Sequence, residues 1–421
     1  MTSFMESGAF ENMDFIDRSA PAAPPPDSVW AVAGYKATKA TGATARRRNG
    51  MMLKGRATAE ATAAYASRFP ELPGNFRPVL GLSVSSIGIG TYLGDPDDET
   101  DRAYETAIKA SLRGGINLID AAVNYRFQRS ERNIGQAIAE MAETGEIARE
   151  QVVVATKGGY ITFDGGVPAN PRAWFEEHYV KTGIVAPTDL VDGSHCMTPK
   201  YIGTMLELSR KNLNLETIDI YYIHNPETQL EAVERKEFLA RMATIFEFLE
   251  GAVADGKIGV YGTATWNGYR AAQTERGWLS LDELIRIARE VGGDTHHFRA
   301  IQLPYNLAMP EAITRSNQIV QGGKATTLAA AKALGVAVAA SATLLQGQLS
   351  RRLPPIVADA FSGFATDAQR SIQFTRSTPG VDVALVGMKS VDHVRDTLET
   401  ARKPPATLEE LMRLFQHGDE P

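Results

Sequence analysis

The chain has a single cysteine, Cys196, among its 421 residues. One cysteine excludes an intramolecular disulfide and a cysteine-rich zinc site, and it is typical of proteins from a reducing compartment. Long apolar runs are also missing, since no stretch approaches the roughly 20 apolar residues of a transmembrane helix. The N-terminus lacks the charged and apolar regions of a secretory signal. The sequence therefore predicts a cytoplasmic protein with no membrane partner.

An excess of basic charge is absent as well. Lys and Arg number 44 against 50 Asp and Glu, which gives a formal net charge of -6. Such a balance offers no general basic surface, so we expect no nucleic-acid partner for the main body. The composition is that of an ordinary globular protein, 43% hydrophobic and 22% charged. The length suits one barrel of about 250–300 residues with extensions, or two to three smaller domains.

The N-terminal part, residues 1–56, is predicted to be a largely disordered extension. Its first 28 or so residues are acidic and then rich in Ala and Pro, a composition that cannot bury a core. Residues 36–56 carry basic side chains and no acid. We interpret them as a solvated arm in preference to a segment that contacts an anionic partner. A short helix is expected in a lead-in at 57–77, before a main domain at 78–405 and a tail at 406–421.

Short β-branched runs alternate with amphipathic stretches through the main domain. The expected strands are Ile87–Thr91, Ile116–Ile119, Val152–Thr156, Thr217–Ile223, Ile258–Gly262, Ala300–Leu303, Val336–Ala340 and Val383–Val386. The expected helices are Asp101–Arg113, Ser130–Glu143, Pro199–Leu213, Leu230–Ala254, Leu281–Val291, Thr326–Leu334, Asp367–Arg376 and Val391–Arg402. Eight strand-then-helix units predict an α/β fold, a (β/α)8 TIM barrel. Two short apolar runs about Gly81 predict a hairpin that plugs the barrel floor.

A barrel of this kind has its active site at the C-terminal ends of the strands. The longest Gly- and Pro-rich loop, Gly158 to Thr198, follows the third expected strand, and another, Ser341 to Gly363, follows the seventh. Long loops on that face commonly shape a substrate site. We therefore expect both loops to border the site.

Three adjacent strands end in ionisable residues. Asp120 closes the second strand, with Tyr125 in the turn after it, Lys157 closes the third, and His224 closes the fourth, where Pro226 stops the ladder. Taken singly, each has a structural explanation as a cap, a rim aromatic, a snorkelling side chain or a hydrogen-bonded histidine. Taken together, they resemble a device for proton transfer.

The chemistry follows from the residue types. A phenol with a pKa near 10 is a poor donor at neutral pH. A nearby ammonium lowers that pKa, and a carboxylate keeps the lysine charged and oriented. A histidine then holds a carbonyl oxygen by a hydrogen bond. The set suits the addition of a proton to a carbonyl that receives a hydride.

At these residues the chain resembles the aldo-keto reductase superfamily. The matching stretches are Gly115–Tyr125, Arg129–Gly135, Val154–Lys157 and Ile218–Pro226. The resemblance implies an NADP(H)-dependent enzyme, with NAD(H) as the alternative, that reduces an aldehyde, ketone or sugar carbonyl. It implies that Tyr125 is the general acid, that Lys157 and Asp120 tune it, and that His224 orients the substrate. The part played by Asn225, beside His224, stays open.

The resemblance also implies a set of cofactor residues at other strand ends. They are Gly90, Thr91 and Tyr92 beside the nicotinamide ribose, Thr265 and Gln302 at the carboxamide, and Gly387, Met388, Lys389 and Ser390 at the adenine ribose phosphate. A lysine beside helix-start amides favours a 2′-phosphate, hence NADP.

Three positions depart from the family pattern. Ala264 and Thr265 stand where members usually carry Ser-Asn, and Ala340 stands where a stacking tyrosine is frequent. Near the end, Asp396-Thr397 replaces an expected Glu-Asn pair. All three bear on how the cofactor is held.

The residues alone leave other functions open. The same site suits an alcohol or sugar dehydrogenase with Tyr125 as the base, and the altered cofactor positions suit a non-catalytic regulatory subunit. The run Gly88–Gly94 resembles a dinucleotide fingerprint, but its spacing is Gly-x-Gly-x-x-x-Gly and Asp95-Pro96 follows it instead of a helix. A metal-dependent hydrolase would need paired histidines, whereas His195 and His296-His297 lie in loops. We expect no metal and leave the oligomeric state open.

Overall fold

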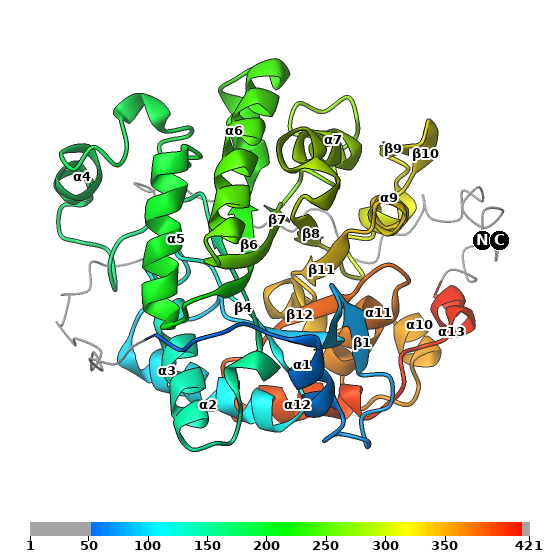
Figure 1. Cartoon of the computed structure of the whole chain (residues 1–421). Coiled ribbons are helices and arrows are strands. Elements are labelled where there is room, and N and C mark those ends of the chain that lie inside the picture. Colours follow the sequence, from blue (N-terminus) through cyan, green and yellow to red (C-terminus); the bar gives the residue numbers. More distant parts are fainter. Residues whose placement is uncertain (1–51, 415–421) are drawn as a thin grey trace.

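The computed structural model describes residues 52–414. Eight parallel strands close into a barrel, surrounded by helices (Figure 1). In chain order these are β3 (Ile87–Gly90), β4 (Leu118–Asp120), β5 (Val153–Gly158), β6 (Ile218–His224), β7 (Ile258–Ala264), β8 (Phe298–Pro304), β11 (Ala337–Ser341) and β12 (Val383–Gly387). Each strand pairs with the next, and β12 pairs with β3 to close the ring. The predicted (β/α)8 barrel is confirmed, and every expected strand is present.

Helices follow the strands as the periodicity predicts. They are α2 (Asp98–Arg113), α3 (Arg129–Glu143), α5 (Pro199–Leu213), α6 (Arg235–Ala254), α7 (Leu281–Gly292), α9 (Thr327–Leu334), α11 (Asp367–Ser377) and α12 (Val391–Ala401). In α2, for example, Tyr104, Ala107, Ile108 and Leu112 are buried on one face, which is the spacing of an amphipathic helix. One expected start is wrong: the helix predicted from Leu230 begins at Arg235, because Pro226–Glu231 forms a separate 3-10 turn, η5.

The core has two layers because the strands are buried on both faces. Ile89, Ile119 and Val154 pack outward against the helices, whereas Leu118 and Val153 pack inside the barrel. Strands buried on both sides are continuously apolar, which explains why the strand runs stand out in the sequence.

The barrel floor carries the predicted hairpin. Strands β1 (Phe76–Val79) and β2 (Leu82–Ser85) are antiparallel. Leu80 and Gly81 both have positive φ, 53° and 79°, as a tight two-residue hairpin turn requires. Val79 and Val84 join the interior apolar cluster. The helix expected before it is α1 (Ala59–Ala66), capped by Thr58.

The end of the predicted extension lies along the barrel. Leu53 N donates to Asn214 O at 2.9 Å, and Ala57 N donates to Asp219 Oδ1 at 2.7 Å. Residues 1–51, most of the expected disorder, lie outside the described residues. In the predicted tail, α13 (Leu408–Arg413) buries Leu411, and residues 415–421 are again outside. The domain boundaries stay predictions.

Both long loops follow the strands that the sequence indicates. The loop after β5 contains α4 (Pro171–Phe175), a π-helical turn η3 (Glu176–Val180) and a 3-10 turn η4 (Pro187–Asp189). The loop after β11 contains η7 (Leu345–Ser350) and α10 (Pro355–Ala360). Among residues 52–414, no helix combines the length and apolar character needed to cross a bilayer.

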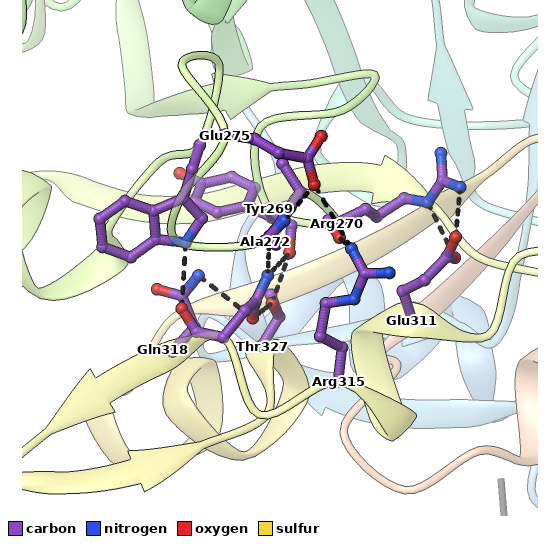
Figure 2. Close-up of polar contacts among 11 residues, drawn as sticks. Tyr269, Arg270, Ala272, Glu275, Glu311, Arg315, Gln318 and Thr327 are labelled. Carbon is purple, nitrogen blue, oxygen red and sulfur yellow. Dashed lines mark hydrogen bonds and ion pairs between the residues drawn. The ribbon is translucent and has the colours of Figure 1, made fainter. Parts of the chain in front are cut away.

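One insertion was not expected from the sequence. After β8 the chain forms α8 (Glu311–Thr314) and the hairpin β9 (Gln318–Val320) and β10 (Gly323–Ala325), seen at the upper right of Figure 1. This insertion joins the loop after β7 through a polar network (Figure 2). Arg270 pairs with Glu311 at 2.8 Å, and just after the insertion Thr327 Oγ1, at the start of α9, donates to Tyr269 O at 2.8 Å. The two loops therefore form one unit at the rim.

Candidate active site

The predicted proton-transfer residues come from three neighbouring strands. Asp120 is the last residue of β4, and His224 is the last residue of β6. Lys157 lies between them, one residue before the end of β5. Because parallel strands end at the same edge, their side chains gather at one rim. The turn after β4 returns Tyr125 to this group.

Lys157 is the centre of the group. Its Nζ donates to Asp120 Oδ2 and to Ala121 O, each at 2.7 Å, and lies 3.2 Å from Tyr125 Oη. An ammonium has three donors, so these partners satisfy all of them. The side chain is 0% exposed. The structure thus brings three of the four residues into direct contact.

His224 lies between two tyrosine rings. Its ring centroid is 6.0 Å from that of Tyr125 and 5.1 Å from that of Tyr160, both edge-on. Its Nδ1 is buried without a hydrogen-bond partner among the described residues. A buried polar atom without a partner costs free energy.

The charges at the site follow from burial. Burial lowers the pKa of Lys157, and the Asp120 carboxylate opposes that shift. Burial, followed by the Lys157 ammonium and His195, lowers the pKa of His224 well below its usual value, so that its ring is neutral. Burial, followed by the Asp120 carboxylate, raises the pKa of Tyr125 well above its usual value.

The expected lowering of the tyrosine pKa is therefore wrong. The physical reason is that burial, the negative charge of Asp120 and the neighbouring Tyr92 all disfavour the phenolate. The consequence is chemical: Tyr125 holds its proton at neutral pH. A raised pKa also makes the phenol a weaker acid, so proton transfer from it needs a nearby positive charge to stabilise the phenolate.

The residues predicted at the nicotinamide end are linked to one another. Gln302 Nε2 donates to Asp120 Oδ1 at 2.7 Å, and Thr91 Oγ1 donates to Asp120 O at 2.8 Å. Thr265 N donates to Gln302 O at 2.8 Å. Tyr92 is 55% exposed and packs edge-on against Tyr125 at 5.0 Å. These residues lie together at the rim beside the proton-transfer group.

The residues predicted at the phosphate end follow β12. Gly387 pairs in register with Gly90 of β3, which places the two predicted regions side by side. Met388 is fully buried, while Lys389 is exposed and forms no ion pair within residues 52–414. Ser390 caps α12 by accepting a hydrogen bond from His393 N.

The departures from the family pattern have local explanations. The Asp396 carboxylate accepts hydrogen bonds from Thr366 and, at 2.7 Å, from Gln369 Nε2. It therefore holds the first turn of α11. Ala340 is fully buried in β11 and offers no ring for stacking.

Sequence reasoning missed several polar residues beside His224. Tyr160 receives a hydrogen bond from Asn225 Nδ2 at 3.1 Å, so Asn225 acts on a rim aromatic. His195, considered only as a metal ligand, contacts His224. Glu227 accepts three backbone hydrogen bonds from the loop after β7. No periodicity marks these residues, because their partners come from distant loops. In the described part of the chain, no cluster of three metal-ligating side chains occurs.

Comparisons with known proteins identify the family of the barrel. The aldo/keto reductase family model matches residues 86–355. Aldo-keto reductase YhdN of Bacillus subtilis is 41% identical over 83 residues, 18% of this chain and 23% of the relative. The NADH-specific methylglyoxal reductase of Escherichia coli is 32% identical over 149 residues, 34% of this chain and 39% of the relative. The chain thus matches well under half the length of these two curated relatives.

The fold has close structural counterparts. A crystal structure of an aldo/keto reductase from Klebsiella pneumoniae, in complex with NADP and acetate, is similar with a TM-score of 0.54 and 19% identity. The similarity covers 82% of this chain and 94% of that one. With the family model matching most of the barrel, we conclude that the chain belongs to the aldo/keto reductase family.

Proposed function

We propose that the protein reduces a small-molecule carbonyl, an aldehyde, ketone or sugar, with NADP(H), and that Tyr125 is the general acid. The observation that carries the proposal is the contact of Lys157 Nζ with both Asp120 and Tyr125, at 2.7 and 3.2 Å. A buried ammonium beside a phenol is suited to stabilise a phenolate after proton transfer. The single cysteine, buried Cys196, fits action in the cytoplasm.

Each residue has a defined task in this reaction. Tyr125 donates its proton to the carbonyl oxygen as negative charge develops there. Lys157 stabilises the resulting phenolate, and Asp120 keeps the lysine charged despite its burial. His224 is neutral, so its single N–H is available to hold the carbonyl oxygen.

The proposed cofactor site rests on the hydrogen-bonding groups at the other strand ends. The nicotinamide, when bound, supplies the hydride. Thr265 and Gln302 would hold its carboxamide, and Lys389 with the first turn of α12 would hold the 2′-phosphate. The exposed Lys389 without an ion pair among the described residues supports NADP over NAD. The Klebsiella pneumoniae structure in complex with NADP supports the same choice.

The test is cofactor-dependent turnover. We expect oxidation of NADPH, followed by its absorbance, with at least one member of an aldehyde, ketone and sugar panel. Tyr125→Phe should abolish turnover and leave NADPH binding intact, because it removes only the hydroxyl that carries the proton. Undiminished turnover in Tyr125→Phe would overturn the assignment of the acid.

Two other outcomes identify the alternatives. Turnover only in the direction of alcohol or sugar oxidation would indicate a dehydrogenase with Tyr125 as the base. Cofactor binding without turnover on any substrate would indicate a regulatory subunit. A Lys389→Met variant tests the cofactor: it should weaken NADPH binding about 10-fold, or about 1.4 kcal/mol, and leave NADH binding unchanged.

A further inference from the structure

A second histidine is bonded to the end of the strand that carries His224. His195 Nε2 lies 2.7 Å from His224 O, and the side chain of His195 is fully buried. His195 belongs to the far end of the loop after β5. That end pairs with the start of the same loop, since Cys196 N donates to Gly159 O and Ile161 N donates to Ser194 O, each at 2.8 Å. The loop is thus closed at the site.

Hydrogen-bond donors and acceptors fix which nitrogen of His195 carries the proton. Arg241 Nη1 donates to Gln229 Oε1 at 2.6 Å, and an arginine has no acceptor. The Gln229 amide therefore faces His195 with its Nε2, 2.8 Å from His195 Nδ1. Because that amide nitrogen only donates, Nδ1 must accept. The proton of the neutral ring is on Nε2, which donates to His224 O.

The space around this bond is closed. A Cβ at Gly159 would lie 2.8 Å from His224 O and 2.9 Å from His195 Nε2. The Tyr160 ring covers both histidines, with centroids 5.0 Å from His195 and 5.1 Å from His224. Beyond His224 the backbone turns sharply, because Asn225 has φ of 43°. A fixed carbonyl at His224 therefore fixes the Cα from which its ring extends, and the Tyr160 ring packs against that ring.

We propose that His195 is a positioning residue for the reaction: its Nε2–H holds the backbone carbonyl of His224. Arg241, acting through Gln229, keeps His195 in the tautomer that has this Nε2–H. The proposal rests on the proposed carbonyl reduction for its kinetic consequence. The assignment of the His195 tautomer rests only on the hydrogen bonds. The low pKa of His195, about 4 because of burial, agrees with a neutral ring.

The first experiment needs no substrate. NMR of protein labelled with 15N-histidine at neutral pH should show His195 as the neutral Nε2–H tautomer. In Gln229→Glu the new carboxylate accepts from Nδ1, so His195 should become doubly protonated. An Nδ1–H tautomer in the wild type, or an unchanged His195 signal in Gln229→Glu, would overturn the assigned chain of bonds.

The second experiment compares two substitutions of His195. His195→Leu removes the donor to His224 O, and we expect kcat to fall about 10- to 100-fold, with NADPH affinity unchanged. His195→Gln retains an N–H donor and should restore most of the activity. The ring signals of His224 should shift in His195→Leu and return in His195→Gln. The control is His297→Leu, at the opposite end of the barrel, where the ring bonds Glu250.

Each result decides a separate question. Wild-type kcat in His195→Leu, or equal losses in His195→Leu and His195→Gln, would overturn the positioning role. If the wild type turns over no carbonyl, the proposed function fails, and the His224 ring signals still decide the positioning. Unmoved His224 signals in His195→Leu would then overturn it.

Discussion

Gln302 Nε2 donates a hydrogen bond to Asp120 Oδ1 at 2.7 Å, although 182 positions separate the two residues. Asp120 ends β4, and Gln302 lies two residues before the end of β8; the two strands lie on opposite sides of the closed barrel. The other oxygen of Asp120 accepts from Lys157. Asp120 therefore connects the residues proposed to hold the nicotinamide to those proposed to move the proton.

Replacing Gln302 should affect both halves of the site. In Gln302→Ala we expect NADPH affinity to fall about 10-fold, the equivalent of one hydrogen bond of about 1.4 kcal/mol. We also expect kcat to fall, because Asp120 Oδ1 loses its donor and Lys157 loses alignment. Fluorescence titration and steady-state kinetics measure the two effects. A change in affinity with an unchanged kcat would restrict Gln302 to the cofactor.

Replacing Lys157 should act on chemistry alone. Without the ammonium, the phenolate left by Tyr125 is unsupported, so Lys157→Met should lower kcat about 100- to 10,000-fold. NADPH binding should be retained, since Lys157 is enclosed by Asp120, Ala121 and Tyr125. Single-turnover kinetics with pre-bound NADPH checks this. A loss of cofactor binding instead would contradict the assigned role.

The burial of His195 should make the free energy of unfolding depend on pH. Its unfolded pKa is near 6.5, whereas burial lowers the pKa of His195 to about 4 in the fold. Between these values the unfolded chain binds a proton that the folded chain does not. The contribution of His195 to the free energy of unfolding is thus fully present above pH 6.5, and about 3 kcal/mol of it is lost as the pH falls to 4. The lowered pKa of His224 acts in the same direction.

Denaturant unfolding between pH 7.5 and 4.5 measures this dependence. The raised pKa values of the buried carboxyls Glu131 and Glu227 act in the opposite direction, since protonation favours their folded state. The informative quantity is therefore the difference between the wild type and His195→Gln. We expect a shallower loss of stability on acidification in the variant. Parallel curves for the two proteins would contradict the buried neutral state of His195.

Glu227 should fix the loop after β7. Its Oε1 accepts from the backbone N–H groups of Trp266, Asn267 and Gly268 at 2.8 to 3.1 Å. Glu227→Ala leaves three backbone donors without an acceptor, of which that of Gly268 is buried, so we expect a loss of about 2–3 kcal/mol in the free energy of unfolding. NADPH binding should also weaken, because Thr265 begins the same loop. Glu227→Gln retains an acceptor and should lose less, which denaturant unfolding would show.

Asn317 should be essential for the joined loops of Figure 2. Its Nδ2 donates to Tyr269 O and Ala271 O, each at 2.8 Å, and its side chain is buried. Asn317→Ala removes the donor to Ala271 O and one of the two donors to Tyr269 O, and we expect a loss of about 2 kcal/mol in thermal or denaturant unfolding. Lys324→Ala, an exposed position on the adjacent hairpin, is the control and should change stability by less than about 0.5 kcal/mol. Equal effects in the two variants would contradict the network.

Part of the site was predictable because it depends on the ends of regular elements. Strand runs are continuously apolar, so a charged residue at the end of one, such as Asp120 or Lys157, stands out. The start of α6 was not predictable in this way. The residues from Pro226 to Glu231 mix apolar and polar side chains as a helix does. The side chains of Glu227 and Gln229 instead bind distant loops, and the segment forms a 3-10 turn.

The charge state of Tyr125 is another property beyond the sequence. The presence of Lys157 nearby predicted a lowered pKa, yet the pKa of Tyr125 is raised. Burial depends on everything that packs around a group, including Tyr92 from the loop after β3. A list of neighbouring charges does not include that contribution.

The barrel, the order of its strands and the rim that carries Asp120, Lys157 and His224 follow from the sequence, because hydrophobic periodicity and strand ends are local properties. The hydrogen bonds of Gln302 to Asp120 and of His195 to His224 follow only from the folded arrangement. Those bonds join residues from separate loops and opposite strands. Their geometry is set when the barrel closes and the loops pack over it.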